Sequence, residues 1–252
     1  MTLKTTEYKG ITLLKGRSAH PHWENNTQTL DGLMSHEEEH TSFMEFLEVV
    51  ENKEDPLMIE IGPWWSFWSL CFRQKFPHGS NFIIEIGKRH LDVALTNFKL
   101  NGYDVDAEWG GFFLDHSNTV VYPDSNYNYN LEDLLENGTH DPENVHFNES
   151  LEGDMVGPEL DFVTLYNEKQ LDNIDVLHVD IQGSEYPLMR QLTASKILNK
   201  IQSIIVATHS PNIHNAIKYI LETNSFTILK EGLYGTVGGD GMFVATKRKQ
   251  GK

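Results

Sequence analysis

The sequence predicts an α/β fold with a Rossmann-like, mostly parallel seven-stranded sheet, an antiparallel C-terminal hairpin and helices on both faces. Three observations predict it. From residue 57 onward, short β-branched apolar runs alternate with segments of helical periodicity, which is the pattern of βαβ units and a parallel sheet. Stop signals such as Asn101-Gly102 separate these segments. The last two apolar runs lie too close together for a crossover helix, so they form a hairpin.

The elements follow in order along the chain. Strands are expected at 57–62, 81–87, 105–109, 174–181 and 201–209, and in the final segments FTILKE and GMFVATK. Helices are expected at about 66–76, 88–101, 185–193 and 212–223. An earlier helix should begin near Ser35, because Ser35 and Glu38 form a capping box ahead of apolar residues at helical spacing.

The length of 252 residues suits one α/β domain. We expect residues 1–54 to form an N-terminal flap and helix, and residues 55–252 to form the main domain. An insertion at about 115–160 is rich in Asn, Asp, Glu, Gly and Pro. Such a segment is either a binding loop or a mobile excursion.

Composition restricts partners and location. Lys and Arg number 20 against 37 Asp and Glu, a formal charge of −17, which would repel a phosphate backbone or an anionic membrane. We therefore expect no nucleic acid and no membrane as partner, with the basic residues near Lys247 forming a solvated chain end. A single cysteine, Cys71, and the lack of a long apolar run suggest a cytoplasmic location. The oligomeric state stays open.

Ligands of open α/β sheets bind at the carboxyl ends of the strands. Gly62 follows the first expected strand and permits a sharp turn into a helix, whose free N–H groups can bind an anion. Glu85 ends the second strand and is placed to accept hydrogen bonds from both hydroxyls of a ribose. Glu60, Asp180 and His209 occupy comparable strand-end positions.

Dinucleotide binding is the nearest alternative. Its fingerprint is G-x-G-x-x-G, in which the second glycine keeps the backbone bare for a pyrophosphate. Trp64 occupies that second position here. The sequence therefore disfavours NAD or FAD bound in the usual way, and favours a smaller nucleoside that carries an amino-acid tail.

Three segments resemble the FkbM-type family of class I S-adenosylmethionine-dependent methyltransferases. The family's first-strand pattern lies over Glu60, Gly62 and the aromatic residues that follow, and its second-strand pattern lies over Glu85, Asn97 and Asn101-Gly102. The most specific segment is IDVLHVDIQGSE at 174–185. The resemblance covers about residues 57–111 and 161–210.

The resemblance implies methyl transfer from S-adenosylmethionine to a hydroxyl of a sugar, a glycan or a glycosylated small molecule. The cofactor-binding candidates are Glu60, Gly62, Pro63, Ser66, Glu85 and Ile86. The acceptor-binding candidates are Trp64, Trp65, Glu185 and His116. The chain departs from the family pattern at Trp64, Ser66, His178 and Gln182, so a catalytically inactive nucleoside-binding or interaction module on the same scaffold is the alternative.

A sugar hydroxyl is a poor nucleophile at neutral pH, so its attack needs a base or a metal. His209 is the candidate base, because an imidazole titrates near working pH. Asp180 would orient the hydroxyl, accept its proton, or bind Mg²⁺ or Mn²⁺ together with His209. A third metal ligand would come from Asp115 or His116 in the insertion. His178, inside an apolar strand, is expected to be a buried structural histidine.

Overall fold

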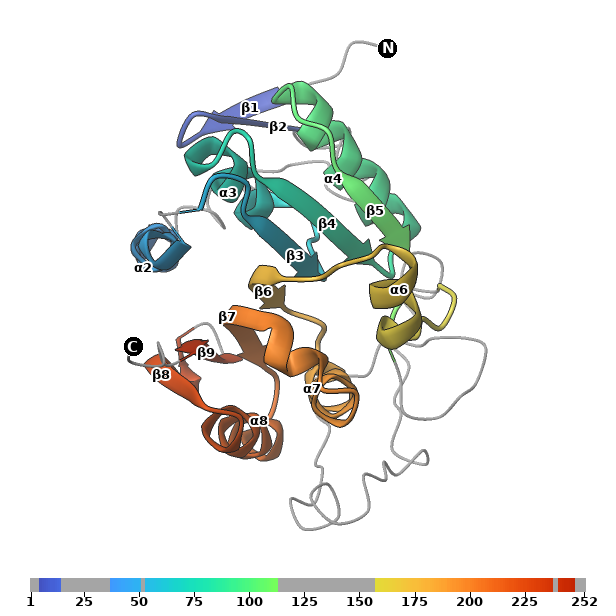
Figure 1. Cartoon of the computed structure of the whole chain (residues 1–252). Helices are drawn as coiled ribbons and strands as arrows, with labels where there is room; N and C mark the ends of the chain where they lie inside the picture. Colours follow the sequence, from blue (N-terminus) through green and yellow to red (C-terminus); the bar gives the residue numbers. More distant parts are fainter. Residues whose placement is uncertain (1–4, 15–36, 51–52, 113–156, 238–239, 248–252) are drawn as a thin grey trace, which may run out of the picture.

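The computed structural model describes residues 5–14, 37–50, 53–112, 157–237 and 240–247. A seven-stranded sheet in the order β5-β4-β3-β6-β7-β9-β8 runs through the molecule (Figure 1). Its strands are β3 (Leu57–Ile61), β4 (Ser80–Glu85), β5 (Asp106–Trp109), β6 (Ile174–Val179), β7 (Ile201–Thr208), β8 (Phe226–Val237) and β9 (Asp240–Lys247). The first five are parallel, and β9 is antiparallel to both β7 and β8. The predicted fold class is confirmed.

Helices cover both faces of the sheet (Figure 1). One layer contains α2 (Glu37–Phe46), the 3-10 helix η2 (Leu47–Val50), α3 (Phe67–Lys75) and α4 (Lys88–Leu100). The other contains α6 (Phe162–Glu168), α7 (Glu185–Ala194), the 3-10 helix η5 (Ile197–Lys200) and α8 (Pro211–Thr223). Successive strand residues point to opposite faces, so Met58 packs into the first layer and Ile59 into the second. This double burial explains the continuous apolar runs of the central strands.

The N-terminal segment contains a hairpin that the sequence analysis missed. Strands β1 (Thr5–Tyr8) and β2 (Ile11–Leu14) pair antiparallel within the stretch expected to be a flap. Lys9 and Gly10 join them with φ of 52° and 77°, the left-handed pair that tight hairpin turns require. Strands of four residues are too short to give a clear alternation of apolar and polar residues, which is why the sequence did not predict them.

Other differences lie at the edges of the fold. Helix α6 was not predicted, because its seven residues span fewer than two turns. Asp161 caps it by accepting a hydrogen bond from Val163 N. The predicted capping residue Ser35 and most of the predicted insertion fall outside the described residues, and the division at residue 54 stays a prediction. Among the helices described, none has the length and apolar character needed to cross a bilayer.

Candidate functional site

A cavity of about 180 Å³ lies at the carboxyl ends of β3, β4, β5 and β6. Its wall consists of Ile61, Gly62, Trp64, Ile84, Glu85, Ile86, Gly110, Gly111, Phe112, Asp180, Ile181, Gln182 and Ser184. Five of the predicted site residues are on this wall: Gly62, Trp64, Glu85, Ile86 and Asp180. The parallel sheet brings them together, because strand ends that are far apart in the chain meet at one edge.

Glu85 connects two loops of the cavity. Its side chain is buried, Oε1 accepts a hydrogen bond from Gly87 N at 2.8 Å, and Oε2 accepts one from Trp64 N at 3.2 Å. A carboxylate offers about four lone-pair positions, so these two backbone donors leave it able to accept hydrogen bonds from a ligand as well. The carboxylate is thus held in a fixed position on the wall.

Gly62 lies where two loops cross. A Cβ atom at this position would lie 1.8 Å from the carbonyl oxygen of Asp180, and Gly62 has φ of +78°. Asp180 N in turn donates to Ile61 O at 2.9 Å. The glycine is therefore required by the close approach of the loop after β6, and it places Asp180 beside the loop after β3.

The loop after β3 adopts left-handed backbone conformations without glycine. Trp64 and Ser66, two of the positions where the chain departs from the FkbM-type pattern, have φ of 49° and 60°, a conformation that Gly and Asn tolerate best. Ser66 is fully buried, and its hydroxyl has no hydrogen-bond partner among the described residues. Trp64 is 40% exposed and its ring lies 4.2 Å from that of His90.

Glu60, a predicted cofactor-binding residue, is fully buried against α3 and is not on the cavity wall. It points to the α3 side of the sheet, where Oε2 accepts a hydrogen bond from Ser69 N at 3.3 Å. Its Oε1 lies 3.6 Å from Nδ1 of His178, its register neighbour on β6. Burial raises the pKa of Glu60 to about 8 and lowers the pKa of His178 to about 4. Both side chains are therefore predominantly neutral at pH 7, and His178 is the buried histidine that was expected.

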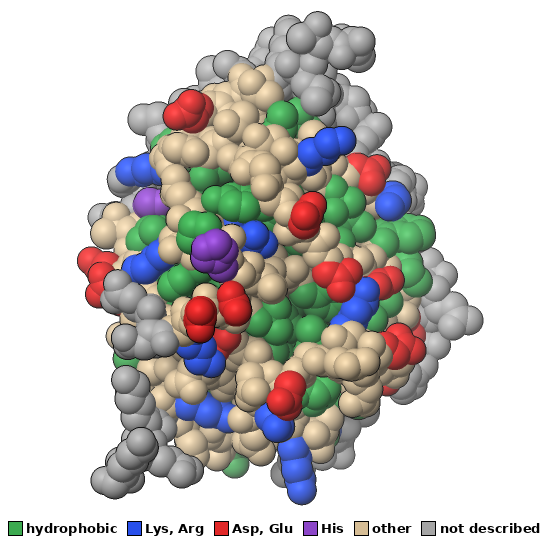
Figure 2. All heavy atoms as spheres, turned by 45° about the horizontal axis from the view of Figure 1, so that its top comes forward, with side chains coloured by type: hydrophobic (Ala, Val, Ile, Leu, Met, Phe, Trp, Pro, Cys, Tyr) green, Lys and Arg blue, Asp and Glu red, His purple; other side chains and the backbone are tan. Residues whose placement is uncertain are grey.

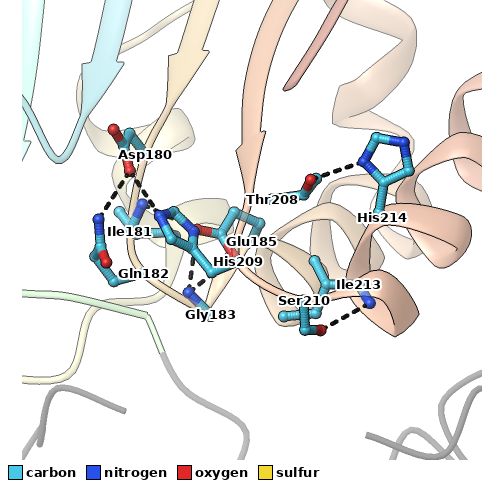
Figure 3. A network of polar contacts seen from close by, with 10 residues as sticks. All are labelled: Asp180, Ile181, Gln182, Gly183, Glu185, Thr208, His209, Ser210, Ile213 and His214. Atoms are coloured by element: carbon cyan, nitrogen blue, oxygen red, sulfur yellow. Dashed lines mark hydrogen bonds and ion pairs between the residues drawn. The ribbon is translucent and has the colours of Figure 1, made fainter. Parts of the chain in front are cut away.

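Next to the cavity, an imidazole lies between two carboxylates (Figure 3). His209 Nδ1 is 2.7 Å from Glu185 Oε1, and His209 Nε2 is 3.4 Å from Asp180 Oδ1. His209 and Glu185 are almost fully buried, whereas the side chain of Asp180 is 42% exposed. Asp180 is therefore the member of this group that a ligand in the cavity can reach.

The same three residues place possible metal-ligand atoms within 4.8 Å of one another. Glu185, however, already accepts hydrogen bonds from His209 and from the backbone N–H groups of Ile181 and Gly183. Of these three residues, only Asp180 and His209 then remain as metal ligands in the described part of the chain. A catalytic metal usually has three protein ligands. The described donor set fits a hydrogen-bonded relay better than a metal site, and no reaction step is assigned to a metal.

The other predicted site residues do not reach the cavity wall. Pro63 is buried within the loop, and Trp65 is half-buried with its carbonyl accepting a hydrogen bond from Asn97 Nδ2. Glu185, predicted to contact the acceptor, is fully buried and contacts Nδ1 of His209, whose Nε2 faces Asp180. His116 and Asp115 lie outside the described residues.

The wall also contains residues that the sequence analysis overlooked. Gly110, Gly111 and Phe112 follow β5 and complete the cavity on that side. A Cβ at Gly110 would lie 2.5 Å from Pro158 O. The glycine is therefore needed for the segment at 157–160 to lie this close to the backbone after β5. The glycine pair directly after the third predicted strand was the available signal, because it repeats the strand-to-turn arrangement of Gly62.

No protein-family model matches the chain, and no curated protein matches it. Solved structures with a similar fold include an O-methyltransferase of Bacillus cereus in complex with S-adenosylhomocysteine (12% identity, 82% of this chain, 81% of that chain, TM-score 0.49). They also include a precorrin-6y C5,15-methyltransferase of Geobacter metallireducens (12%, 83%, 87%, TM-score 0.48) and a putative RNA methyltransferase of Pyrococcus horikoshii (8%, 84%, 83%, TM-score 0.44).

The last of these structures corrects the expectation that nucleic acid is excluded as a partner. A chain with a similar fold is described as a putative RNA methyltransferase. The face drawn in Figure 2 has acidic and basic side chains interspersed. The net charge of −17 is therefore not spread as a uniformly acidic surface over this face. By its own strand order, the chain is a Rossmann-like α/β protein with a mostly parallel seven-stranded sheet.

Proposed function

We propose that the protein is an S-adenosylmethionine-dependent O-methyltransferase of FkbM type that acts on a hydroxyl of a sugar, a glycan or a glycosylated small molecule. One observation carries the proposal. Asp180 lies on the wall of the same cavity as Glu85, and a buried histidine stands directly behind it. A group that recognises a nucleoside and a group that can take a proton therefore face one space.

The chemistry of the wall suits this cofactor. Glu85 would accept hydrogen bonds from the ribose hydroxyls, and the apolar Ile86 and Phe112 would pack against the adenine. The carboxylates of Glu85 and Asp180 would attract the sulfonium and ammonium charges, whereas they would repel the pyrophosphate of a dinucleotide. When bound, S-adenosylmethionine supplies an electrophilic methyl group.

Asp180 would orient the acceptor hydroxyl and take its proton. When the hydroxyl is methylated, Asp180 Oδ1 would accept the proton that the hydroxyl loses. His209, 3.4 Å away, would stabilise the proton on this side of the cavity. Positioning of this kind and general-base catalysis each lower the barrier without any covalent intermediate on the protein.

Calorimetry with S-adenosylmethionine and S-adenosylhomocysteine tests the cofactor assignment. We expect the wild type to bind both, and Glu85→Gln to bind at least about 10-fold more weakly, the equivalent of losing one charge-assisted hydrogen bond. Glu108→Gln, on the adjacent strand β5 but not on the wall, should bind as the wild type does. No binding by well-folded protein at millimolar cofactor would rule the proposal out.

An acceptor panel tests the reaction itself. Free sugars, glycans, glycosylated natural products and RNA would each be incubated with cofactor, and S-adenosylhomocysteine would be measured. Turnover on a sugar hydroxyl supports the proposal, and turnover on RNA alone would redirect it. Binding without turnover on any acceptor would favour the alternative, an inactive nucleoside-binding module, which the departures at Trp64, Ser66 and Gln182 motivate. Loss of turnover in EDTA, restored by Mg²⁺ or Mn²⁺, would show that a metal is required.

A further inference from the structure

We propose that Glu185 is a positioning residue that fixes His209 and Asp180 relative to each other, and does not contact the acceptor. The proposal rests on the proposed function for its role in catalysis, while the arrangement itself can be tested separately. Glu185 is fully buried at the first position of α7. The cavity wall includes Ser184 but not Glu185.

The first step is the contact with the imidazole. Glu185 Oε1 lies 2.7 Å from His209 Nδ1, a distance typical of a charge-assisted hydrogen bond. Glu185 Oε1 also accepts a hydrogen bond from Ile181 N, so it acts as an acceptor here and we assign the proton of this contact to Nδ1. This fixes the ring orientation and directs Nε2 at Asp180, as Figure 3 shows.

The second step is the contact with the loop that carries Asp180. Glu185 Oε1 accepts a hydrogen bond from Ile181 N at 3.1 Å, and Oε2 accepts one from Gly183 N at 2.9 Å. The backbone of this loop has positive φ at two successive residues, 54° at Gln182 and 111° at Gly183. One carboxylate therefore holds both the loop after Asp180 and the ring behind it. It sets the 3.4 Å separation between Asp180 Oδ1 and His209 Nε2.

The consequence concerns the proton that methyl transfer releases. The acceptor loses its O–H proton to Asp180, and this proton is shared with His209 Nε2. The Nδ1–H bond to Glu185 stays intact throughout, so the carboxylate of Glu185 stabilises the positive charge that develops on the ring. This division of roles follows the general pattern in which an acid buried behind a histidine orients it and favours its charged form.

Proton NMR and three variants test the arrangement. We expect a slowly exchanging, downfield ring N–H resonance in the wild type, which His209→Gln removes and thereby assigns. Glu185→Gln should shift it upfield or broaden it, because a neutral amide is a weaker acceptor than a carboxylate. Glu231→Gln is the matched control, since it removes a carboxylate from a second buried histidine, His214, outside the cavity. The control should leave the His209 resonance unchanged.

Two results would overturn the proposal. One is an unchanged resonance in folded Glu185→Gln. The other is loss of the resonance when ZnCl₂ is added to the wild type, because Nδ1 would then be a metal ligand and not a hydrogen-bond donor. If Glu185→Gln fails to fold, Glu185→Asp serves instead: it keeps the charge but retracts the carboxylate, and should weaken the resonance without removing it.

The catalytic role needs an acceptor from the panel above. Glu185→Gln should lower kcat by about 100-fold, within the range that general-base catalysis contributes, with the acceptor KM and the Kd for S-adenosylhomocysteine unchanged. Glu185→Asp should recover part of kcat. An unchanged kcat would overturn the positioning role. If the wild type fails to bind cofactor, the proposed function fails, whereas the NMR result still decides whether Glu185 holds His209.

Discussion

Gly62 is a single residue on which the geometry of the site depends. We expect Gly62→Ala to lower the free energy of unfolding by about 3 kcal/mol or more, because overpacking adds to left-handed strain. Its Cβ would lie 1.8 Å from the Asp180 carbonyl oxygen, which must move. Urea denaturation would measure the loss, and calorimetry the accompanying loss of cofactor affinity.

Gly102→Ala is the matched control for this prediction. Gly102 has a similar φ of +74°, but nothing lies within 4 Å of its Cβ position. It should lose only the conformational part, about 1 kcal/mol, and keep cofactor affinity. Equal losses in the two variants would contradict the role assigned to the crossing of the two loops.

For Ser66 we expect the opposite effect, a gain in stability when it is replaced by glycine. Ser66→Gly should stabilise the protein by about 1 to 2 kcal/mol, because it relieves a left-handed conformation and removes a buried hydroxyl without a partner among the described residues. Lys196→Gly, at an exposed site with φ of 63°, should gain only the conformational part. A shift in the urea midpoint of Ser66→Gly no larger than that of Lys196→Gly would show that the buried hydroxyl costs nothing.

At the scale of elements, two asparagines of α4 attach the N-terminal hairpin. Asn101 bonds both N–H and C=O of Thr12, as a neighbouring strand would. Asn97 accepts a hydrogen bond from Leu14 N and donates one to Trp65 O. Asn97 therefore connects the hairpin to the loop after β3, whereas Asn101 bonds the hairpin and the carbonyl of Asn97 within α4 but not that loop.

This difference can be measured. Asn97→Ala and Asn101→Ala should each destabilise the protein by about 1 to 3 kcal/mol, because each leaves buried backbone groups unpaired. Both should speed hydrogen exchange in β2. Only Asn97→Ala should also weaken cofactor binding, since it alone releases the Trp65 carbonyl. Equal cofactor affinity in the two variants would show that the contact of Asn97 with the Trp65 carbonyl does not affect the cofactor site.

The elements were predictable to different degrees. The central strands β3, β4, β6 and β7 were found from sequence because burial on both faces makes them continuously apolar. β1, β2 and α6 were missed because they are short and their order depends on tertiary contacts, such as the asparagine contacts to β2. Short elements have too few residues for periodicity to show.

At the scale of the whole molecule, the buried pair of Glu60 and His178 sets a pH dependence of stability. Burial raises the pKa of Glu60 from 4.5 to about 8, so between these pH values the unfolded chain loses a proton that the folded chain keeps. Stability falls with rising pH across this window, on the order of 1 kcal/mol per pH unit. Burial lowers the pKa of His178 from 6.5 to about 4, which has the opposite effect in that range. The two effects offset each other up to about pH 6.5, and Glu60 dominates from there to pH 8.

Urea unfolding at pH 5, 6.5 and 8 would check this. The wild type should lose stability between pH 6.5 and 8, and Glu60→Gln should not, because its amide is neutral at every pH and can still accept from Ser69 N. Parallel pH curves for the two proteins would show that Glu60 is ionised in the folded state at pH 6.5.

The sequence by itself determined the α/β class, the central strands and the edge of the sheet where the site lies, because periodicity and strand-end position are local properties. It also placed Glu85 and Asp180 correctly at that edge. Only the tertiary structure decided that Glu60 faces α3, that Gly62 is required by the close approach of the Asp180 carbonyl, and that Glu185 lies against His209. Those facts depend on which strands are neighbours and on which face each side chain points to, and contacts between residues distant in the chain are set by packing.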